Sequence, residues 1–132
     1  MKIVFLSTAI LLSVLTGCQE SFEKRVERTW REYTEKNCPQ VIIETITMDS
    51  CVFEADSHTL HFYYRFLGAM DNDSIELKSD AMRKLLLEAL RNETSFREYK
   101  EAGYSFKYTY FSDKQPGHLR YETNFVKEDY NN

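Results

Sequence analysis

The chain has 132 residues and a formal net charge of −4, from 17 Lys and Arg and 21 Asp and Glu. This length fits one domain, and a hydrophobic share of 42% with 14% aromatic residues supports a real core and argues against disorder. Mild acidity argues against a nucleic-acid-binding protein, which normally carries a basic surface. With only 4 Gly and 2 Pro, collagen-like and low-complexity chains are excluded.

The N-terminus has the order of a bacterial lipoprotein leader. Met1-Lys2 is a short positive start, and residues 3–15 are mostly apolar but short for a spanning helix, which needs about 20 apolar residues. The following Leu15-Thr16-Gly17-Cys18 resembles the lipobox, in which the cysteine thiol accepts a diacylglycerol. The resemblance implies a signal peptide over 1–17 and an acylated Cys18 that anchors a single domain, residues 18–132, in a membrane.

The residues after Cys18 favour the outer membrane. The next residue is not Asp, the signal that retains lipoproteins in the inner membrane of enteric bacteria. Gln19-Glu20 also resembles the surface-export signal of Bacteroidetes lipoproteins. We therefore expect a cell-envelope lipoprotein of the outer membrane, on its periplasmic or its surface side.

The first half of the remaining chain predicts a helix followed by a hairpin. Apolar residues spaced by three and four positions indicate an amphipathic helix over 21–36, which ends before Pro39. Alternating apolar and polar residues then predict strands over about 44–55 and 59–66, joined by a tight turn. Trp30 in this helix is expected to be largely buried against the sheet.

The second half repeats the same order. A polar connection over 69–78 leads into a helix over 79–92, followed by a short helical turn over 95–102. Alternation predicts two further strands over 104–111 and 119–125, and the polar C-terminal residues are expected to fray. The prediction is an α+β fold in αββαββ order, with a four-stranded antiparallel sheet and two helices packed on one face.

Four short segments of the chain carry a resemblance to a known family. They are Cys38-Pro39, Thr47-Met48-Asp49-Ser50, Phe62-Tyr63-Tyr64, and Gly103-Tyr104 with Tyr108 and Tyr110. These segments resemble a family of small exported bacterial proteins, some of which are labelled as a quorum-sensing-regulated virulence factor. The similarity covers about residues 38–112, and Ile43-Glu44 stands where the family usually has Val-Asp. The family brings no catalytic residues, so the resemblance implies a fold rather than an activity.

No local motif indicates catalysis or metal binding. The residues His58, His61 and His118 do not have the spacing of zinc ligands, and the acidic residues over 71–80 lack the Gly and Glu of a calcium loop. Neither a nucleophile elbow nor a phosphate loop is present. We expect no enzyme activity, no metal and no cofactor; the alternative is an enzyme whose site is assembled from distant residues.

Cys38 and Cys51 are the two cysteines outside the leader. An even pair in an oxidising compartment favours a disulfide. If residues 41–51 form one extended strand, however, Cys51 lies about 30 Å along the chain from its start, whereas bridged Cα atoms lie within about 7 Å. A bridge requires a sharp bend between Val41 and Thr47, and the sequence leaves both states open.

The polar face of the predicted sheet gathers aromatic and cationic residues. Such residues are enriched in the hot spots of protein interfaces. These residues are candidates for a binding face toward another envelope protein; the alternative, a solvated sheet face whose residues pair across strands, is the more common arrangement. The candidate residues are His61, Tyr63, Arg65, Lys107, Phe111 and Arg120.

Ser74 is a candidate modification site. Asp73-Ser74-Ile75 resembles the O-glycosylation signal of Bacteroidetes, and the polar connection around it suits access by a transferase. The alternative is a chance match to a short motif.

The sequence therefore predicts a lipid-anchored binding or accessory module of the cell envelope, without catalytic activity. Its expected partners are the membrane, through the acylated Cys18, and another envelope protein, but no nucleic acid. The alternative is an inhibitor or immunity-type protein that acts on an envelope enzyme. The tandem αββ order is similar to that of secreted β-lactamase inhibitor proteins, which is an analogy at the level of the fold.

Overall fold

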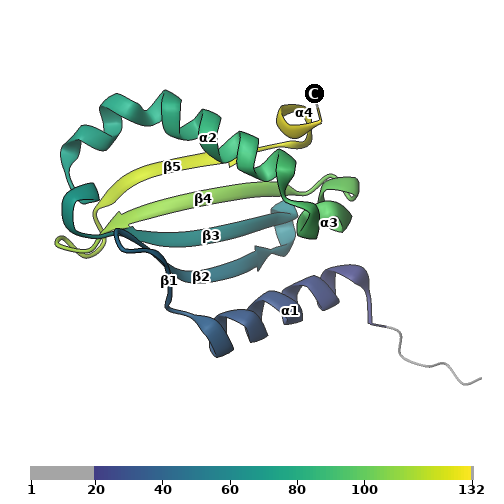
Figure 1. The fold of residues 1–132 in the computed structure, drawn as a ribbon. Coiled ribbons are helices and arrows are strands. Elements are labelled where there is room, and N and C mark those ends of the chain that lie inside the picture. Colours follow the sequence, from purple (N-terminus) through teal and green to yellow (C-terminus); the bar gives the residue numbers. More distant parts are fainter. Residues whose placement is uncertain (1–19, 132) are drawn as a thin grey trace, which may run out of the picture.

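The structure is a computed structural model that describes residues 20–131, apart from the side chains of residues 76 and 77. Five strands form one sheet, in the spatial order β1-β2-β3-β4-β5 (Figure 1). Within the described residues, none of the helices is both long and apolar enough to cross a membrane. The elements are α1 (Phe22–Asn37), β1 (Gln40–Ile43), β2 (Ile46–Glu54), β3 (Thr59–Phe66), α2 (Ser79–Asn92), α3 (Arg97–Glu101), β4 (Ser105–Ser112), β5 (Leu119–Phe125) and α4 (Lys127–Tyr130).

Helix α1 forms where the apolar spacing predicts it. The Ser21 side chain accepts a hydrogen bond from the Lys24 amide at 3.3 Å and so caps the first turn. Val26, on the apolar stripe of the helix, is 2% exposed. At the other end the Cys38 amide donates to the Thr34 carbonyl, and the chain then leaves the helix in an extended conformation.

The sheet has five strands, so the predicted four-stranded sheet is wrong in this detail. The chain turns at Glu44-Thr45, and β1 pairs with β2 in antiparallel register, with Gln40 opposite Met48. The predicted strand over 44–55 missed this turn, because Thr45-Ile46-Thr47-Met48 alternates and so extends the pattern of β2 back into the turn.

The sheet is also mixed rather than antiparallel. Strands β3 and β4 pair in parallel, with Thr59 opposite Ser105 and Phe66 opposite Ser112, whereas the other three strand pairs are antiparallel. The cause is the connection between β3 and β4, which contains α2. This helix returns the chain along the sheet, so that β4 begins at the same end as β3, as in a βαβ unit (Figure 1).

Both long helices contribute to one core on one face of the sheet. Helix α1 lies along β2, and α2 lies along β5 (Figure 1). Helix α3 lies between them: Tyr99 contacts Trp30 of α1, and Lys100 donates to the Leu90 carbonyl of α2. The core joins Val26 and Leu90 to an aromatic layer from the sheet, which includes Phe62, Phe66, Phe106, Tyr108, Tyr110, Tyr121 and Phe125.

Two details near the core differ from the sequence predictions. Trp30 is only partly buried, because its indole lies at the rim, with Nε1 donating to the Tyr99 hydroxyl at 3.2 Å. Residues 127–131 are not frayed: α4 buries Tyr130, whose hydroxyl donates to the Tyr104 carbonyl at 2.7 Å. Together with contacts from Arg83 and Arg91 to Asp129, this buried ring holds the polar segment against the core.

Candidate functional site

The face of the sheet that points away from α1 and α2 is called the open face here. It carries five of the six residues predicted to form a binding face. On β3 and β4 they alternate with the core residues, because neighbouring side chains of a strand point to opposite faces. The five residues are His61, Tyr63, Arg65, Lys107 and Phe111.

Three rings form an aromatic row across β3 and β4. The ring centroids of His61 and Tyr63 are 4.0 Å apart, and those of Tyr63 and Phe111 are 6.5 Å apart with nearly parallel planes, at 5°. His61 is buried, at 4% exposure, whereas Tyr63 and Phe111 are half-buried. The row therefore offers two half-buried rings, and one of them is stacked on the buried imidazole.

A chain of hydrogen bonds holds His61 in place. Its Nδ1 lies 3.1 Å from Glu54 Oε1, and its Nε2 lies 2.6 Å from Thr109 Oγ1. The Thr109 hydroxyl donates to Glu122 Oε2 at 2.7 Å. When Thr109 donates its one proton to Glu122, both ring nitrogens face acceptors, so only the doubly protonated imidazole can donate to both.

The charges around His61 oppose each other. Burial lowers the pKa of His61, and Lys107 lowers it further, whereas the carboxylates of Glu54 and Glu122 raise it. The net pKa lies below the ordinary value of 6.5. At neutral pH the imidazole is therefore neutral and donates through one nitrogen only.

We expect His61 to make the fold less stable in mild acid. Because its pKa is lowered on folding, its contribution is complete above the ordinary pKa of 6.5 and is lost as the pH falls through the folded pKa. Urea unfolding between about pH 8 and pH 5 measures this loss, and His61→Gln should flatten the pH dependence in that window. His118→Gln is the control, because His118 is exposed. Equal slopes for wild type and His61→Gln would contradict the expectation.

Each cation of the open face is paired with carboxylates. Arg65 Nε donates to both Asp49 carboxylate oxygens, at 2.9 and 2.8 Å, and its Nη1 donates to Asp113 Oδ1 at 2.7 Å. Lys107 Nζ lies 3.6 Å from Glu122 Oε1. With Glu54 included, the face has more carboxylates than cations. The sequence suggested cations and aromatic rings; the structure shows aromatic rings in acidic surroundings.

Arg120 does not join the open face. The pairing of β4 with β5 shifts between Tyr110 and Phe111, which lie opposite Tyr121 and Leu119, and so leaves Arg120 in a bulge. Its Nε donates to Asp71 Oδ1 at 2.9 Å, and its Nη1 pairs with Asp73. Arg120 therefore belongs to a polar cluster beside the turn between β4 and β5.

Asp71 is the centre of that cluster. Besides Arg120, its carboxylate accepts from the Ser112 hydroxyl and the Lys114 amide, both at 2.9 Å. Burial alone would raise the pKa of Asp71, but these hydrogen bonds and the Arg120 charge lower it to about 2. The cluster ties the connection after β3 to the turn between β4 and β5.

The connection that carries Ser74 is folded rather than a plain polar loop. Short 3₁₀ helices cover Gly68–Met70 and Asp73–Lys78, and Ile75 is buried. Ser74 is exposed; its amide donates to Asn72 Oδ1 at 2.8 Å, and its hydroxyl donates to the same oxygen. O-glycosylation of Ser74 stays a prediction. The Ser74 hydroxyl is exposed, but its hydrogen bond to Asn72 would have to break before a glycan could be attached.

The remaining predicted sites are the cysteines. Cys38 is half-buried, Cys51 is buried, and both thiols are free. The turn at Glu44-Thr45 supplies the bend that a bridge between them requires. The lipidation site Cys18 and the signal peptide lie outside the described residues.

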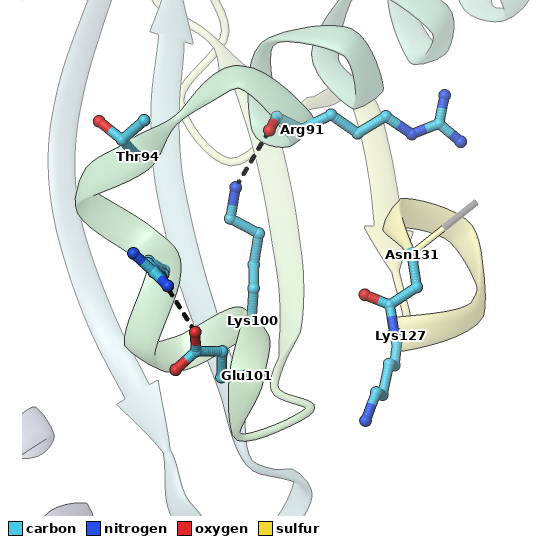
Figure 2. Close-up of a pocket in the computed structure, with 7 residues that line it drawn as sticks. Arg91, Thr94, Lys100, Glu101, Lys127 and Asn131 are labelled. Carbon is cyan, nitrogen blue, oxygen red and sulfur yellow. Dashed lines mark hydrogen bonds and ion pairs between the residues drawn. The ribbon is translucent and has the colours of Figure 1, made fainter.

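A positively charged pocket lies at the other end of the structure, between the end of α2, α3 and α4 (Figure 2). Three of the four cations that line it have protein partners. Lys100 donates to the Arg91 carbonyl (Figure 2) and to the Leu90 carbonyl. Arg97 donates to Glu101 at 3.0 Å. Arg91 itself donates to a carbonyl of α4. The pocket is therefore mainly a junction between helices.

The structure adds residues that the sequence did not single out. Glu54, Thr109 and Glu122 complete the hydrogen-bonded chain of His61. Strand alternation could have placed Thr109 and Glu122 on the open face, since they lie opposite each other on β4 and β5. Among the described residues, no group of three or more His, Cys, Asp or Glu side chains is arranged to hold a metal ion.

Two solved structures share the fold at low sequence identity. A protein of Pseudomonas aeruginosa described as secreted is 14% identical, with a TM-score of 0.62, over 84% of this chain and 98% of that chain. The Type II secretion system pilotin AspS from Vibrio cholerae is 10% identical, with a TM-score of 0.54, over 81% of this chain and 90% of that chain. These likenesses show the α+β fold.

No curated protein matches the chain. The family that matches is described as a domain of unknown function (DUF8479), and the match spans residues 21–120, which covers α1, α2, α3, strands β1 to β4 and the first two residues of β5. The chain therefore belongs to the DUF8479 family.

Proposed function

We propose that this protein is a lipid-anchored accessory protein of the bacterial outer membrane that binds a partner protein through the open face and catalyses no reaction. The open face carries the proposal. Its two half-buried rings, Tyr63 and Phe111, lie in a row whose Tyr63 ring is stacked on His61, which is itself held by Glu54 and Thr109. A rigid aromatic row is the kind of surface that contributes most to protein binding.

The charges of the open face indicate the chemistry of the partner. The carboxylates of Asp49, Glu54, Asp113 and Glu122 exceed the cations of Arg65 and Lys107, so the face is acidic. An Arg or Lys side chain of the partner could lie over the ring of Tyr63 or Phe111 and pair with a carboxylate at the rim. The partner we propose is therefore a positively charged segment of another envelope protein.

The shared fold supports a role in the envelope. One protein with this fold is described as secreted, and another is a pilotin of the Type II secretion system. On this analogy we propose that the partner is a component of a protein-secretion assembly. The anchor in the proposal is the acylated Cys18, inferred from its lipobox-like motif.

The geometry of His61 supports binding rather than catalysis. A carboxylate, an imidazole and a hydroxyl lie in line, as in a nucleophile relay, but Thr109 is only 2% exposed. Its hydroxyl also donates to Glu122, so it does not donate to the imidazole that would have to activate it. The chain of contacts serves to hold the ring row in place.

Photo-crosslinking in the native host tests the proposal. A crosslinking amino acid is placed at Val52, which lies opposite His61 on the open face and is 45% exposed. The control position is Leu85 of α2, which is 67% exposed. We expect one dominant envelope protein to be captured from Val52 and not from Leu85, and Glu122→Arg to reduce the yield by about tenfold, because it reverses a charge of the face.

The outcomes separate the candidate functions. Equal capture from both positions, or capture that Glu122→Arg leaves unchanged, would contradict binding through the open face. A captured enzyme whose activity falls when the purified protein is added would favour the inhibitor or immunity-type function instead.

A further inference from the structure

The turn at Glu44-Thr45 places the two cysteines of the folded domain across from each other. Gln40 of β1 lies opposite Met48 of β2. Two residues before Gln40 the chain reaches Cys38, and three residues after Met48 it reaches Cys51. The difference of one residue corresponds to a bulge in β2, where Asp49 is an extra residue between Met48 and Ser50, which lie opposite Tyr64 and Tyr63. The pairing itself begins at Gln40, and continued by two residues it would place Cys38 opposite Cys51. Opposite residues of antiparallel strands have Cα atoms about 4.5–5.5 Å apart, which is inside the range of disulfide-bonded pairs.

Contacts to Thr34 confirm this placement independently of the strand register. The Cys38 amide donates to the Thr34 carbonyl at 3.0 Å. The Cys51 amide donates to Thr34 Oγ1 at 3.0 Å, and the Thr34 hydroxyl donates to the Cys51 carbonyl at 3.0 Å. Both cysteines are therefore held against the same residue of α1.

The side chains of the two cysteines also interact. Burial raises the pKa of the Cys51 thiol, and the nearby Cys38 raises it further. Burial and Asp49 raise the pKa of the Cys38 thiol, while the neighbouring Thr34 side chain opposes the rise. Cys38 therefore lies in the immediate surroundings of the Cys51 thiol, and Thr34 lies in those of the Cys38 thiol.

We propose that Cys38 and Cys51 form an intramolecular disulfide in the exported protein. Cys38 follows the last residue of α1, and Cys51 lies in the middle of β2. The bond fastens the C-terminal end of α1 to the sheet just before β1 begins. It also fixes one end of the cleft between α1 and β2, which Thr34 and Cys51 line together with Phe53.

The order of the chemical steps follows from exposure. Cys38 is half-buried and Cys51 is 1% exposed, so the Cys38 thiolate reacts first. It attacks a disulfide of an external oxidant, such as a protein disulfide of the envelope, and releases one thiolate of that oxidant. Cys51 then loses its proton to solvent, attacks Cys38 Sγ and releases the second thiolate. Two protein thiols are oxidised, and one external disulfide is reduced to two thiols.

The full chain, exported with its own leader and purified without reductant, tests the proposal. Free thiols are blocked with maleimide during denaturation, and the protein is digested and mapped. We expect a peptide pair joined through Cys38 and Cys51, and a mass about 2 Da below that of the reduced protein. Peptide mapping keeps any signal from Cys18 separate.

Single variants check the roles of the two thiols in the folded protein. In Cys51→Ser, the remaining Cys38 should react with maleimide at least about tenfold faster than the remaining Cys51 does in Cys38→Ser. The wild-type protein decides the proposal even if a variant folds poorly. Maleimide on both cysteines of the exported protein, or glutathione adducts without a Cys38–Cys51 bond after incubation with glutathione disulfide, would overturn it.

Discussion

Replacing Phe106 by alanine is expected to lower the free energy of unfolding by about 4 kcal/mol. Phe106 is fully buried, at 0% exposure, in the strand at the centre of the aromatic core. Its ring centroid lies 5.6 Å from that of Phe96 and 5.5 Å from that of Tyr130, so it joins the connection before α3 and the C-terminal α4 to the sheet. Removing the ring leaves a cavity that these three segments share.

Urea unfolding of wild type and Phe106→Ala measures the difference. A loss of about 4 kcal/mol is a large part of the about 5–15 kcal/mol that usually stabilises a domain. Leu85→Ala is the matched control, because Leu85 is 67% exposed and should change the stability by less than about 0.5 kcal/mol. A similar small change for Phe106→Ala would contradict the position of its ring in the core.

The sequence predicted the helices and most strands because their apolar patterns are long. The predicted helix over 21–36 corresponds to α1, and the one over 79–92 to α2. The strand break at Glu44-Thr45 was hidden because Thr45 already fits the alternation of β2, so the predicted strand began inside the turn. The parallel pairing of β3 and β4 depends on the direction in which α2 returns the chain, which is a property of the tertiary structure.

For the open face, too, the sequence predicted one part correctly and missed another. Alternation along β3 and β4 was enough to place His61, Tyr63 and Phe111 on one side of the sheet. It failed for Arg120, because a bulge of one residue shifts the pairing and turns that side chain toward Asp71. The acidic character of the face could not be predicted either, since it depends on carboxylates such as Asp113 that lie beyond the strands.

The cysteines show how one local detail decides a chemical prediction. The sequence made a bridge conditional on a bend between Val41 and Thr47. The hairpin supplies that bend, and Thr34 of α1 fixes Cys51 beside the end of the helix. The covalent state now depends on the oxidant that the protein meets rather than on the distance along the chain.

Replacing Asp71 by alanine is the second change with a large expected effect, a loss of about 3 kcal/mol, because it leaves buried donors without their partner. The Asp71 side chain is 0% exposed and accepts from Arg120, Ser112 and the Lys114 amide. Asp73 cannot replace it, since its side chain is 93% exposed and meets only the outer end of Arg120. Asp71→Asn is the matched variant, because it keeps the shape and one acceptor but removes the charge, and it should cost less.

The effect of Asp71 should also depend on pH in a defined direction. Its pKa is lowered on folding from 3.8 to about 2, so its contribution is complete above 3.8 and is lost as the pH falls through the folded value. The difference in unfolding free energy between wild type and Asp71→Asn, measured by urea unfolding, should therefore be constant from about pH 7 to pH 5 and shrink toward about pH 2. A difference that stays constant down to that pH would mean that the Asp71 charge does not stabilise the fold, and that shape and hydrogen bonding alone hold the connection after β3 against the turn between β4 and β5.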